Sequence, residues 1–451
     1  MPCACRHVIV WDLQTECLVH HHSKSLAGAV GLALFIAVGT AHATGLAPRE
    51  RQAPLPAPLT AESFAAAVLA RNASLGAMRQ ALVAAVSDIR PAGALPDPML
   101  SVSAAPRTFG GPSGAGEDIE VSQALPWWGT LKVRKEIAQA DAEVARHDLA
   151  ALRLRLAATA RGVFADWVFV HRALAINAAN QSVLGELRRI ASVRYATGKA
   201  PQSDVLQAEV ERTLLAQQQL QWQRKIAVVA ARMNALLDRS PTSLIPLPAA
   251  LPMPAHLPSE AALLQRALTH PQLKALEAEE DAAREKAALA AKHRYPQFQV
   301  SAGYNSMWPD PAMRPMVGLS FTVPLDQGKY RAEIDAAHAQ ARRVEDDLEN
   351  QRVTLLANLS AAYASTREAA KSLALYRDDL VPLSHDALDV ALSEYGSGRG
   401  GFLEVLTAEQ HQLGTALGLA RAQSEYFDRW AELERLSGSG LARPNETGTS
   451  P

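Results

Sequence analysis

An internal repeat constrains the fold of this chain more than any other feature of its sequence. The segment 195–209 recurs 200 positions later as 395–409, and nine of the aligned positions are identical or chemically equivalent. A further match relates the residues around Pro98 to those around Pro296. Self-similarity at a fixed spacing indicates that one structural unit occurs twice. The sequence therefore predicts two halves with the same order of elements: helix, strand pair, very long helix, glycine turn and helix.

Stretches without proline predict the very long helices. No proline occurs between Pro126 and Pro201, or between Pro324 and Pro382. In the first stretch, apolar residues follow steps of three and four, which form one stripe on a helix: Leu149, Leu152, Leu156, Ala160, Val163, Trp167, Val170 and Leu174. A helix from 129 to about 195 would be roughly 100 Å long. Such a helix must pack along other helices as a coiled coil.

Short alternating segments predict one strand pair in each half. Phe298, Val300, Ala302 and Tyr304 alternate with polar or small residues, as expected of a strand with one apolar face. We expect strands at about 98–106, 117–125, 296–306 and 315–323. Aromatic residues make up only 5% of the chain, and helix-forming residues dominate the long stretches between the strands. The predicted fold class is mainly α with a small β part.

Prolines and composition divide the chain into six segments. We expect a signal peptide at 1–43, an extended linker at 44–59, a first repeat at 60–238, a proline-rich connector at 239–259, a second repeat at 260–436 and a disordered tail at 437–451. The signal peptide is indicated by Lys24, a short apolar run and the small-residue site 41–43. The segment before Lys24 is long for a leader, which indicates a translation start further downstream. All three cysteines precede this site, so we expect a mature chain without thiol chemistry or a lipid anchor.

Charge balance and missing motifs exclude several classes of function. The 45 Lys and Arg residues are balanced by 46 Asp and Glu residues, which argues against nucleic acid as a partner. The sequence contains no glycine-rich phosphate loop, no His-Glu-x-x-His and no Gly-x-Ser-x-Gly. We therefore expect no enzymatic activity and no cofactor.

One group of residues could bind a soft metal ion. His293, Met307, Met313 and Met316 lie around the second strand pair, and thioether with imidazole suits Cu(I). Methionine in a core or a loop is the commoner explanation. We therefore assign no metal site and keep these four residues only as candidates.

The strand pairs have the length and alternation of outer-membrane strands, although a half-buried soluble sheet has the same pattern. Four strands cannot close a barrel, which needs about eight or more. Three chains with four strands each would supply twelve and would leave no exposed edge. A homotrimer is the simplest arrangement that satisfies the pattern.

Several motifs resemble those of the TolC family of outer-membrane efflux proteins. They are the Tyr-x-x-Gly-x-x-x-x-x-(Asp/Glu)-Val-Leu-x-Ala-Glu turn in both halves, Asp97-Pro98-Met99-Leu100, and the text from Gln123 to Trp127. The resemblance covers about 59–436, and the last two segments are most similar to the heavy-metal branch of the CzcC and CusC type. It implies a twelve-stranded trimeric barrel in the outer membrane of a Gram-negative bacterium, continued by an α-helical tunnel across the periplasm. It also implies a periplasmic adaptor protein and an inner-membrane pump of the RND type as partners, and heavy-metal cations as substrates.

The resemblance also assigns roles at the periplasmic end of the tunnel. The turns near Gly198 and Gly398 would be the tips, Asp204 would be tied to Tyr395, and Glu404 would belong to an acidic ring. The chain departs from the family pattern in two places. Thr407 stands where relatives have a second acid, and Gly400 stands where a basic residue is common, with Arg399 one position earlier. Asp204 and Glu404 are equally well explained as carboxylates that stabilise helix N-termini.

For the strands, we predict that Val300, Ala302, Leu319 and Phe321 contact outer-membrane lipid, whereas Ser301 and Ser320 face water.

Two alternatives remain for the function. The channel could export drugs or serve type I protein secretion, because a tunnel passes what its pump delivers. A periplasmic coiled-coil adaptor or structural protein would share the leader and the long helices, but it needs no strand pairs with lipid-facing alternation.

Overall fold

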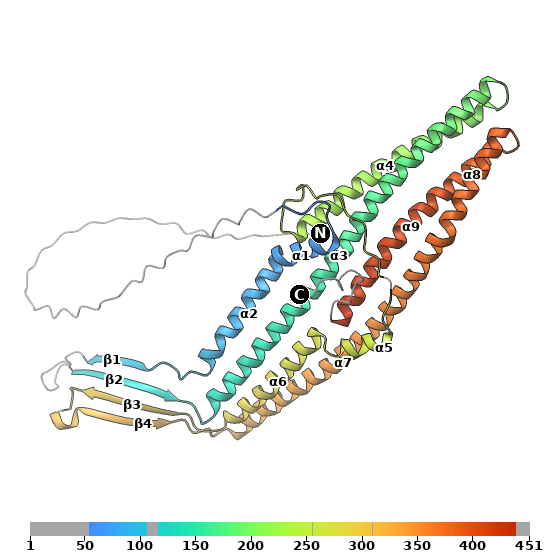
Figure 1. The fold of residues 1–451 in the computed structure, drawn as a ribbon. Coiled ribbons are helices and arrows are strands. Elements are labelled where there is room, and N and C mark those ends of the chain that lie inside the picture. Colours follow the sequence, from blue (N-terminus) through green and yellow to red (C-terminus); the bar gives the residue numbers. More distant parts are fainter. Residues whose placement is uncertain (1–53, 106–115, 255, 309, 439–451) are drawn as a thin grey trace, which may run out of the picture. The chain divides into compact units, whose positions relative to one another are not determined.

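The computed structural model describes residues 54–105, 116–254, 256–308 and 310–438. The expected signal peptide, most of the expected linker and all but the first two residues of the expected tail lie outside these ranges. The first half contains, in order, α1 (Ala61–Arg71), α2 (Ala73–Ala92), β1 (Met99–Ala105), β2 (Gly116–Leu125), α3 (Thr130–Ala196) and α4 (Gln202–Leu236). The second half contains α5 (Glu260–Ala267), α6 (Pro271–Lys292), β3 (Phe298–Asn305), the short 3₁₀ turn η1 (Pro311–Met313), β4 (Pro315–Phe321), α7 (Gln327–Leu375), the π turn η2 (Tyr376–Leu380), α8 (Val381–Ser397) and α9 (Phe402–Ser437). Figure 1 shows that long helices dominate, as predicted.

Helix α3 organises the helical part. It begins after Gly129, which has a left-handed backbone with φ of 76°, and it continues for 67 residues because no proline interrupts it. It packs against α2, α4, α6 and α9. Six of its eight predicted stripe residues are buried, and Val163 and Leu174 are partly buried. The apolar periodicity therefore identified the face of α3 that contacts the other helices.

The second long helix, which runs from α7 through η2 to α8, differs from α3 because it contains a π turn. This turn, η2, comes directly before Pro382, which cannot donate a backbone hydrogen bond and whose ring crowds the preceding turn. The wider turn lets the helix pass the proline instead of ending there. Next to it, the Tyr376 ring lies so close to Gly418 of α9 that a Cβ at this position would overlap the ring.

The four strands form one antiparallel sheet in the order β1-β2-β3-β4. The pairing of β2 with β3 joins the two halves of the chain. Val300 lies opposite Leu319 and Ala302 lies opposite Val317, so these apolar residues share one face, whereas Ser301 lies on the other. The apolar face is largely open to solvent in the single chain, with Leu319 66% exposed and Val317 90% exposed. Strands β1 and β4 are both edge strands (Figure 1).

Buried apolar residues form three clusters along the helices. One joins α1 and α2 to the middle of α3 and the end of α4, and a second joins α5 and α6 to α7 and α9. The third lies where α3, α4, α8 and α9 meet near their turns, and we call it the tip cluster: Leu184, Leu187, Ala191, Ala208, Leu215, Leu388, Tyr395, Phe402, Val405 and Leu406. Among the described residues, no helix combines the length and the apolar character that crossing a membrane requires.

Candidate functional site: the helical tips

Two glycine turns end the long helices at the tips. Gly198 has φ of 68° and Gly398 has φ of 82°, a left-handed conformation that glycine adopts without strain. Pro201 then precedes α4, and Gly401 precedes α9. Both turns lie at the same end of the molecule (Figure 1), and the tip cluster connects the four helices that they join.

The predicted pair of Asp204 and Tyr395 is in direct contact. The Tyr395 hydroxyl donates a hydrogen bond of 3.1 Å to Asp204 Oδ2. Both side chains are buried, with Tyr395 2% exposed and Asp204 9% exposed. Burial, reinforced by the nearby Asp204 carboxylate, raises the pKa of Tyr395 to about 12. The hydroxyl therefore stays protonated at physiological pH and remains a donor. This contact links α4 of the first repeat to α8 of the second.

Arg194 supports the same tyrosine, although the sequence did not indicate it. Its guanidinium lies 4.5 Å from the centre of the Tyr395 ring and donates to the Tyr395 carbonyl. It also donates to the Lys199 carbonyl at 3.3 Å within the first turn, so Arg194 connects this turn to Tyr395 of the second hairpin. The signal was available in the repeat, because Arg194 occupies the position of Glu394, where the charge is reversed.

Glu404 has a different environment from Asp204, its equivalent in the repeat. Its Oε2 accepts a hydrogen bond of 3.1 Å from the Gly401 backbone N–H, so it caps its own helix. Its side chain is exposed. The Arg399 backbone N–H donates to the Glu394 carbonyl at 2.9 Å, which closes the second turn. The structure thus brings Asp204 and Tyr395 together, whereas Glu404 and Arg399 engage their own hairpin.

A groove of about 830 Å³ runs between α8 and α9 next to the second turn. Its walls combine apolar side chains such as Val390 and Leu403 with the carboxylates of Glu394 and Glu404. It is therefore a largely apolar surface with Glu394 and Glu404 at the end nearest the turn and Asp386 at the other end.

Glu409 is a buried carboxyl in the tip region. It is 2% exposed, and its Oε1 has no hydrogen-bond partner among the described residues. Burial raises the pKa of Glu409 to about 7, and the Glu211 carboxylate adds to the effect. The sequence carried a signal, because Glu409 continues the spacing of Phe402, Val405 and Leu406 on the buried face of α9.

The structure does not bring together the candidate ligands for a soft metal. Met307, Met313 and Met316 lie at the loop end of the sheet. His293 ends α6 at the opposite end of β3, and the eight residues of that strand span about 26 Å. The His293 Nδ1 lies 2.6 Å from Glu333 Oε1. In the described part of the chain, no three His, Cys, Asp or Glu side chains are grouped in a way that could hold a metal ion.

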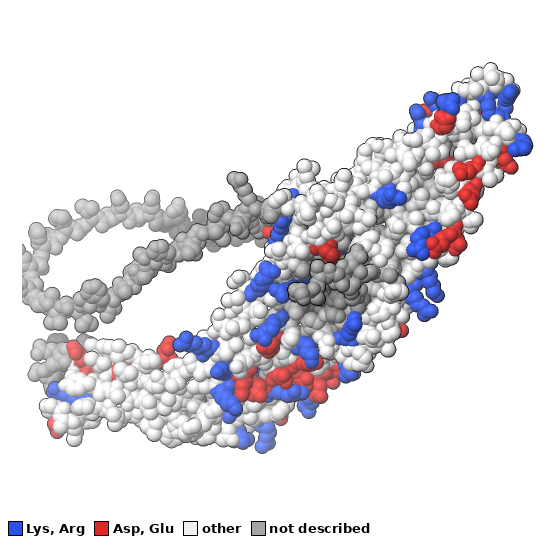
Figure 2. All heavy atoms as spheres, in the orientation of Figure 1, with Lys and Arg blue, Asp and Glu red and all other residues white. Residues whose placement is uncertain are grey.

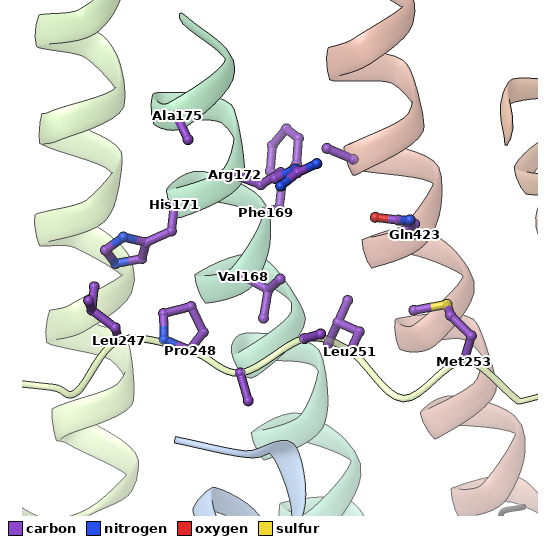
Figure 3. A pocket seen from close by; sticks show the side chains of 13 residues that line it. Val168, Phe169, His171, Arg172, Ala175, Leu247, Pro248, Leu251, Met253 and Gln423 are labelled. Carbon is purple, nitrogen blue, oxygen red and sulfur yellow. The ribbon is translucent and has the colours of Figure 1, made fainter. Parts of the chain in front are cut away.

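A second hollow, of about 500 Å³, lies between α3, the connector and α9 (Figure 3). Most of its lining is aliphatic, including Val168, Leu251 and Met253. Desolvation lowers the pKa of His171, so its imidazole is neutral at physiological pH. The hollow follows from the way the connector crosses the long helices, and we assign it no separate function.

Comparison with known proteins finds a family match in the second repeat. The family model described as Outer membrane efflux protein matches residues 263–439, which is nearly the whole second repeat. The second repeat therefore contains an outer membrane efflux protein domain. Members of the outer membrane efflux protein family are passive channels of the outer membrane that extend into the periplasm, and they act as trimers with an adaptor and an inner-membrane pump. The resemblance to outer-membrane efflux proteins, first seen in the repeated turn motif, is therefore confirmed, as is the localisation in the outer membrane.

Solved structures show the same fold over most of the chain. OprN is 22% identical, with a TM-score of 0.72, and the similarity covers 84% of this chain and 90% of that chain. VceC from Vibrio cholerae is 19% identical, with a TM-score of 0.71 and coverage of 84% and 96%. CusC is 16% identical, with a TM-score of 0.74 and coverage of 84% and 92%. No curated protein matches the chain. These three structures fit about equally well, so they do not single out the heavy-metal branch.

Proposed function

We propose that three copies of this chain form the exit duct of an efflux system, which passes heavy-metal cations delivered by an RND-type pump and a periplasmic adaptor. The observation that carries the proposal is the open four-stranded sheet. It has an exposed apolar face and two unpaired edges at one end of long helices whose turns meet at the other end. Three such sheets would supply the twelve strands of a barrel, and pairing β1 of one copy with β4 of the next would remove every edge.

The apolar face of the sheet would meet lipid. Val300, Ala302, Leu319 and Phe321 share this face, and a charge placed on it near the membrane midplane costs about 2–4 kcal/mol. Leu319→Arg should therefore prevent assembly into the outer membrane. Ser320→Arg, one residue further on the opposite face, should still assemble as trimers. Equal assembly of the two variants, measured by outer-membrane fractionation and native gel electrophoresis, would show that the assigned faces are wrong.

The tips would form the periplasmic gate. The bond between Asp204 and Tyr395 joins the two hairpins of one copy, so a trimer would contain three such ties. Gly198 and Gly398 allow the sharp turns, and Glu404 would contribute charge near the constriction. Arg399 lies in the second turn, one position before Gly400, where the family pattern has a basic residue. The groove between α8 and α9 offers the adaptor an apolar surface at the same end.

The proposal of metal cations as substrates rests on the resemblance to the heavy-metal branch, and drug export is the main alternative. Deleting the gene and measuring growth with zinc, copper or cobalt salts, and separately with hydrophobic drugs, would distinguish the two. Sensitivity to metals alone supports the proposal, and sensitivity to drugs alone contradicts it. Complementation with the intact gene is the control.

Channel formation is tested separately. The purified protein should form trimers and conduct ions in a planar bilayer, and it should remain with the outer membrane on fractionation. A periplasmic coiled-coil adaptor, the alternative from another class, would be released in washes or follow the inner membrane.

A further inference from the structure

A compact aromatic cluster lies where the sheet meets the helices. Trp127 stacks on Tyr295 with ring centres 4.6 Å apart and planes within 7°. Trp128 and Phe298 meet edge to face at 5.8 Å, and Phe298 contacts Phe321 at 6.2 Å. These rings come from the segment between β2 and α3, the segment before β3, and the two strands β3 and β4. The cluster therefore fixes the junction of the strands with α3 and α6.

An apolar hollow of about 300 Å³ opens beside this cluster. It is lined by Leu95, Leu125, Pro126, Trp128, Phe298 and Leu319. The strand registers place Leu125 opposite Phe298, and Leu319 opposite Val300, so the hollow lies on the apolar face of the sheet. Trp128 is 72% exposed at its rim. A hollow without polar side chains and open on a lipid-facing surface suits a hydrocarbon chain.

Two cationic side chains lie next to the same cluster, on its helical side. The Lys292 ammonium donates to the Trp128 carbonyl at 3.2 Å. The Arg294 guanidinium lies 5.1 Å from the Tyr295 ring centre and donates to its hydroxyl at 3.0 Å. No ion pair of the described residues involves either side chain. Lys292 thus holds its charge next to a residue that lines the hollow, and Arg294 holds its charge on the ring that stacks on Trp127. Figure 2 shows blue side chains where the sheet joins the helices.

We propose that this junction binds one anionic phospholipid per protomer, with an acyl chain in the apolar hollow and the headgroup phosphate at Lys292 and Arg294. The arrangement of the groups matches the parts of such a lipid. An apolar hollow and two cations that form no ion pair with the described residues both lie at the junction of the sheet and the helices. Cations near a membrane surface favour anionic lipids, and tryptophan rings are stable at the boundary between hydrocarbon and headgroups. The inference rests on the proposed function, because it requires the apolar face of the sheet to contact lipid.

The test measures which lipid stays on the purified trimer. The protein is reconstituted in nanodiscs with equal amounts of phosphatidylglycerol and phosphatidylcholine, extracted with mild detergent and analysed by native mass spectrometry. We expect the trimer to retain phosphatidylglycerol over phosphatidylcholine by about tenfold, because two cations act on each headgroup. Equal retention of the two lipids by the wild-type trimer would overturn the inference.

Matched variants locate the site. Lys292→Gln should lower the preference to about threefold, because only the Arg294 cation remains at the headgroup. Lys286→Gln removes the same charge from the same helix, but Lys286 faces Asp141 at 3.4 Å and should leave the preference unchanged. Equal effects of the two lysine variants would show that the preference reflects net charge, and the site would be rejected.

A second arm tests the apolar hollow. Trp128→Ala should reduce the number of lipids retained per trimer, and glycerophosphoglycerol, which has no acyl chains, should not displace the lipid. Displacement by this soluble headgroup would contradict the role of the hollow. Trimer mass and single-channel conductance are recorded for every variant. A protein that forms no trimeric channel would refute the proposed function itself, whereas channels without lipid preference would refute only this inference.

Discussion

The two tip hairpins have closely similar sequences, yet equivalent residues make different contacts in them. Asp204 reaches across to Tyr395 of the other hairpin, whereas Glu404 caps its own helix. Tyr395 is 2% exposed, but its equivalent Tyr195 is 47% exposed. The first hairpin thus supplies the acceptor of the tie and the second supplies its donor. A duplicated motif has in this way become a pair of complementary surfaces.

The buried face of the tips shows the same divergence. Glu209 accepts from Arg188 at 3.2 Å and from Arg212 at 2.9 Å near the surface. Its equivalent, Glu409, is buried, and the Glu211 carboxylate adds to the rise of its pKa instead of neutralising its charge. The long helices differ as well, since α3 is continuous whereas a π turn separates α7 from α8. The second half therefore differs from the first by a buried carboxyl at the tip and by a π turn in its long helix.

The largest expected effect comes from neutralising Glu409. A carboxyl whose pKa is raised by burial stabilises the packed state below pH 4.5, and this contribution is lost as the pH rises through about 7. Glu409→Gln should therefore stabilise the packed tip at pH 8 by about 3 kcal/mol, with little effect at pH 4. The measurement is hydrogen exchange of α9 amides near the turn, corrected for intrinsic rates.

Glu209→Gln is the matched control for this comparison. It weakens exposed ion pairs, so it should destabilise the first tip by about 0–1 kcal/mol instead of stabilising it. Changes of the same sign in both variants at pH 8 would mean that the two glutamates have equivalent environments, and the contrast between the hairpins would not hold.

The next effect concerns the tie itself. Removing both partners with Asp204→Ala and Tyr395→Phe should cost about 0.5–1.5 kcal/mol per protomer. Because a trimer would contain three ties, single-channel conductance in a planar bilayer should rise while trimer assembly is unchanged. Tyr195→Phe alters the equivalent exposed tyrosine and should leave conductance at the wild-type value. An unchanged conductance in the double variant would mean that the gate lies elsewhere.

Arg194 should have a smaller effect on the same gate. Arg194→Gln removes the cation above the Tyr395 ring, an interaction worth about 0.5–1 kcal/mol at exposed sites, together with the bond to the Tyr395 carbonyl. It leaves the bond between Tyr395 and Asp204 in place. Conductance should therefore rise less than in the double variant. If Arg194→Gln opened the channel as far as the double variant does, the arginine would be the main latch and the hydroxyl bond would be secondary.

The smallest effect is expected for Glu404→Gln. The amide oxygen can still accept from the Gly401 N–H, so the resting aperture should stay nearly unchanged. Loss of the negative charge should weaken the preference for cations, which is measured as a shift of the reversal potential in a salt gradient. A larger resting conductance without such a shift would place Glu404 in the latch.

Much of the fold could be predicted because it depends on local patterns. Apolar spacing gave the buried face of α3, and alternation gave the two sides of β3. The pairing of Asp204 with Tyr395 came from the family resemblance that the repeated turn motif carries. The register of β2 against β3 could not be predicted, since it pairs segments far apart in the chain. The repeat marked Arg194 by a reversal of charge at this position, but its contact with Tyr395 depends on how four helices pack and could not be read from that signal. Pro382 would be expected to end a helix, but the π turn before it lets the helix continue.

The two open edges of the sheet have a genetic consequence. If β1 of each copy pairs with β4 of the next, a defective edge strand in one copy damages a closed barrel that intact copies also need. With equal expression of intact and defective chains and random mixing, only about one trimer in eight would consist of intact chains alone. Edge-strand mutations would then be dominant, whereas mutations that prevent a chain from reaching the membrane would be recessive.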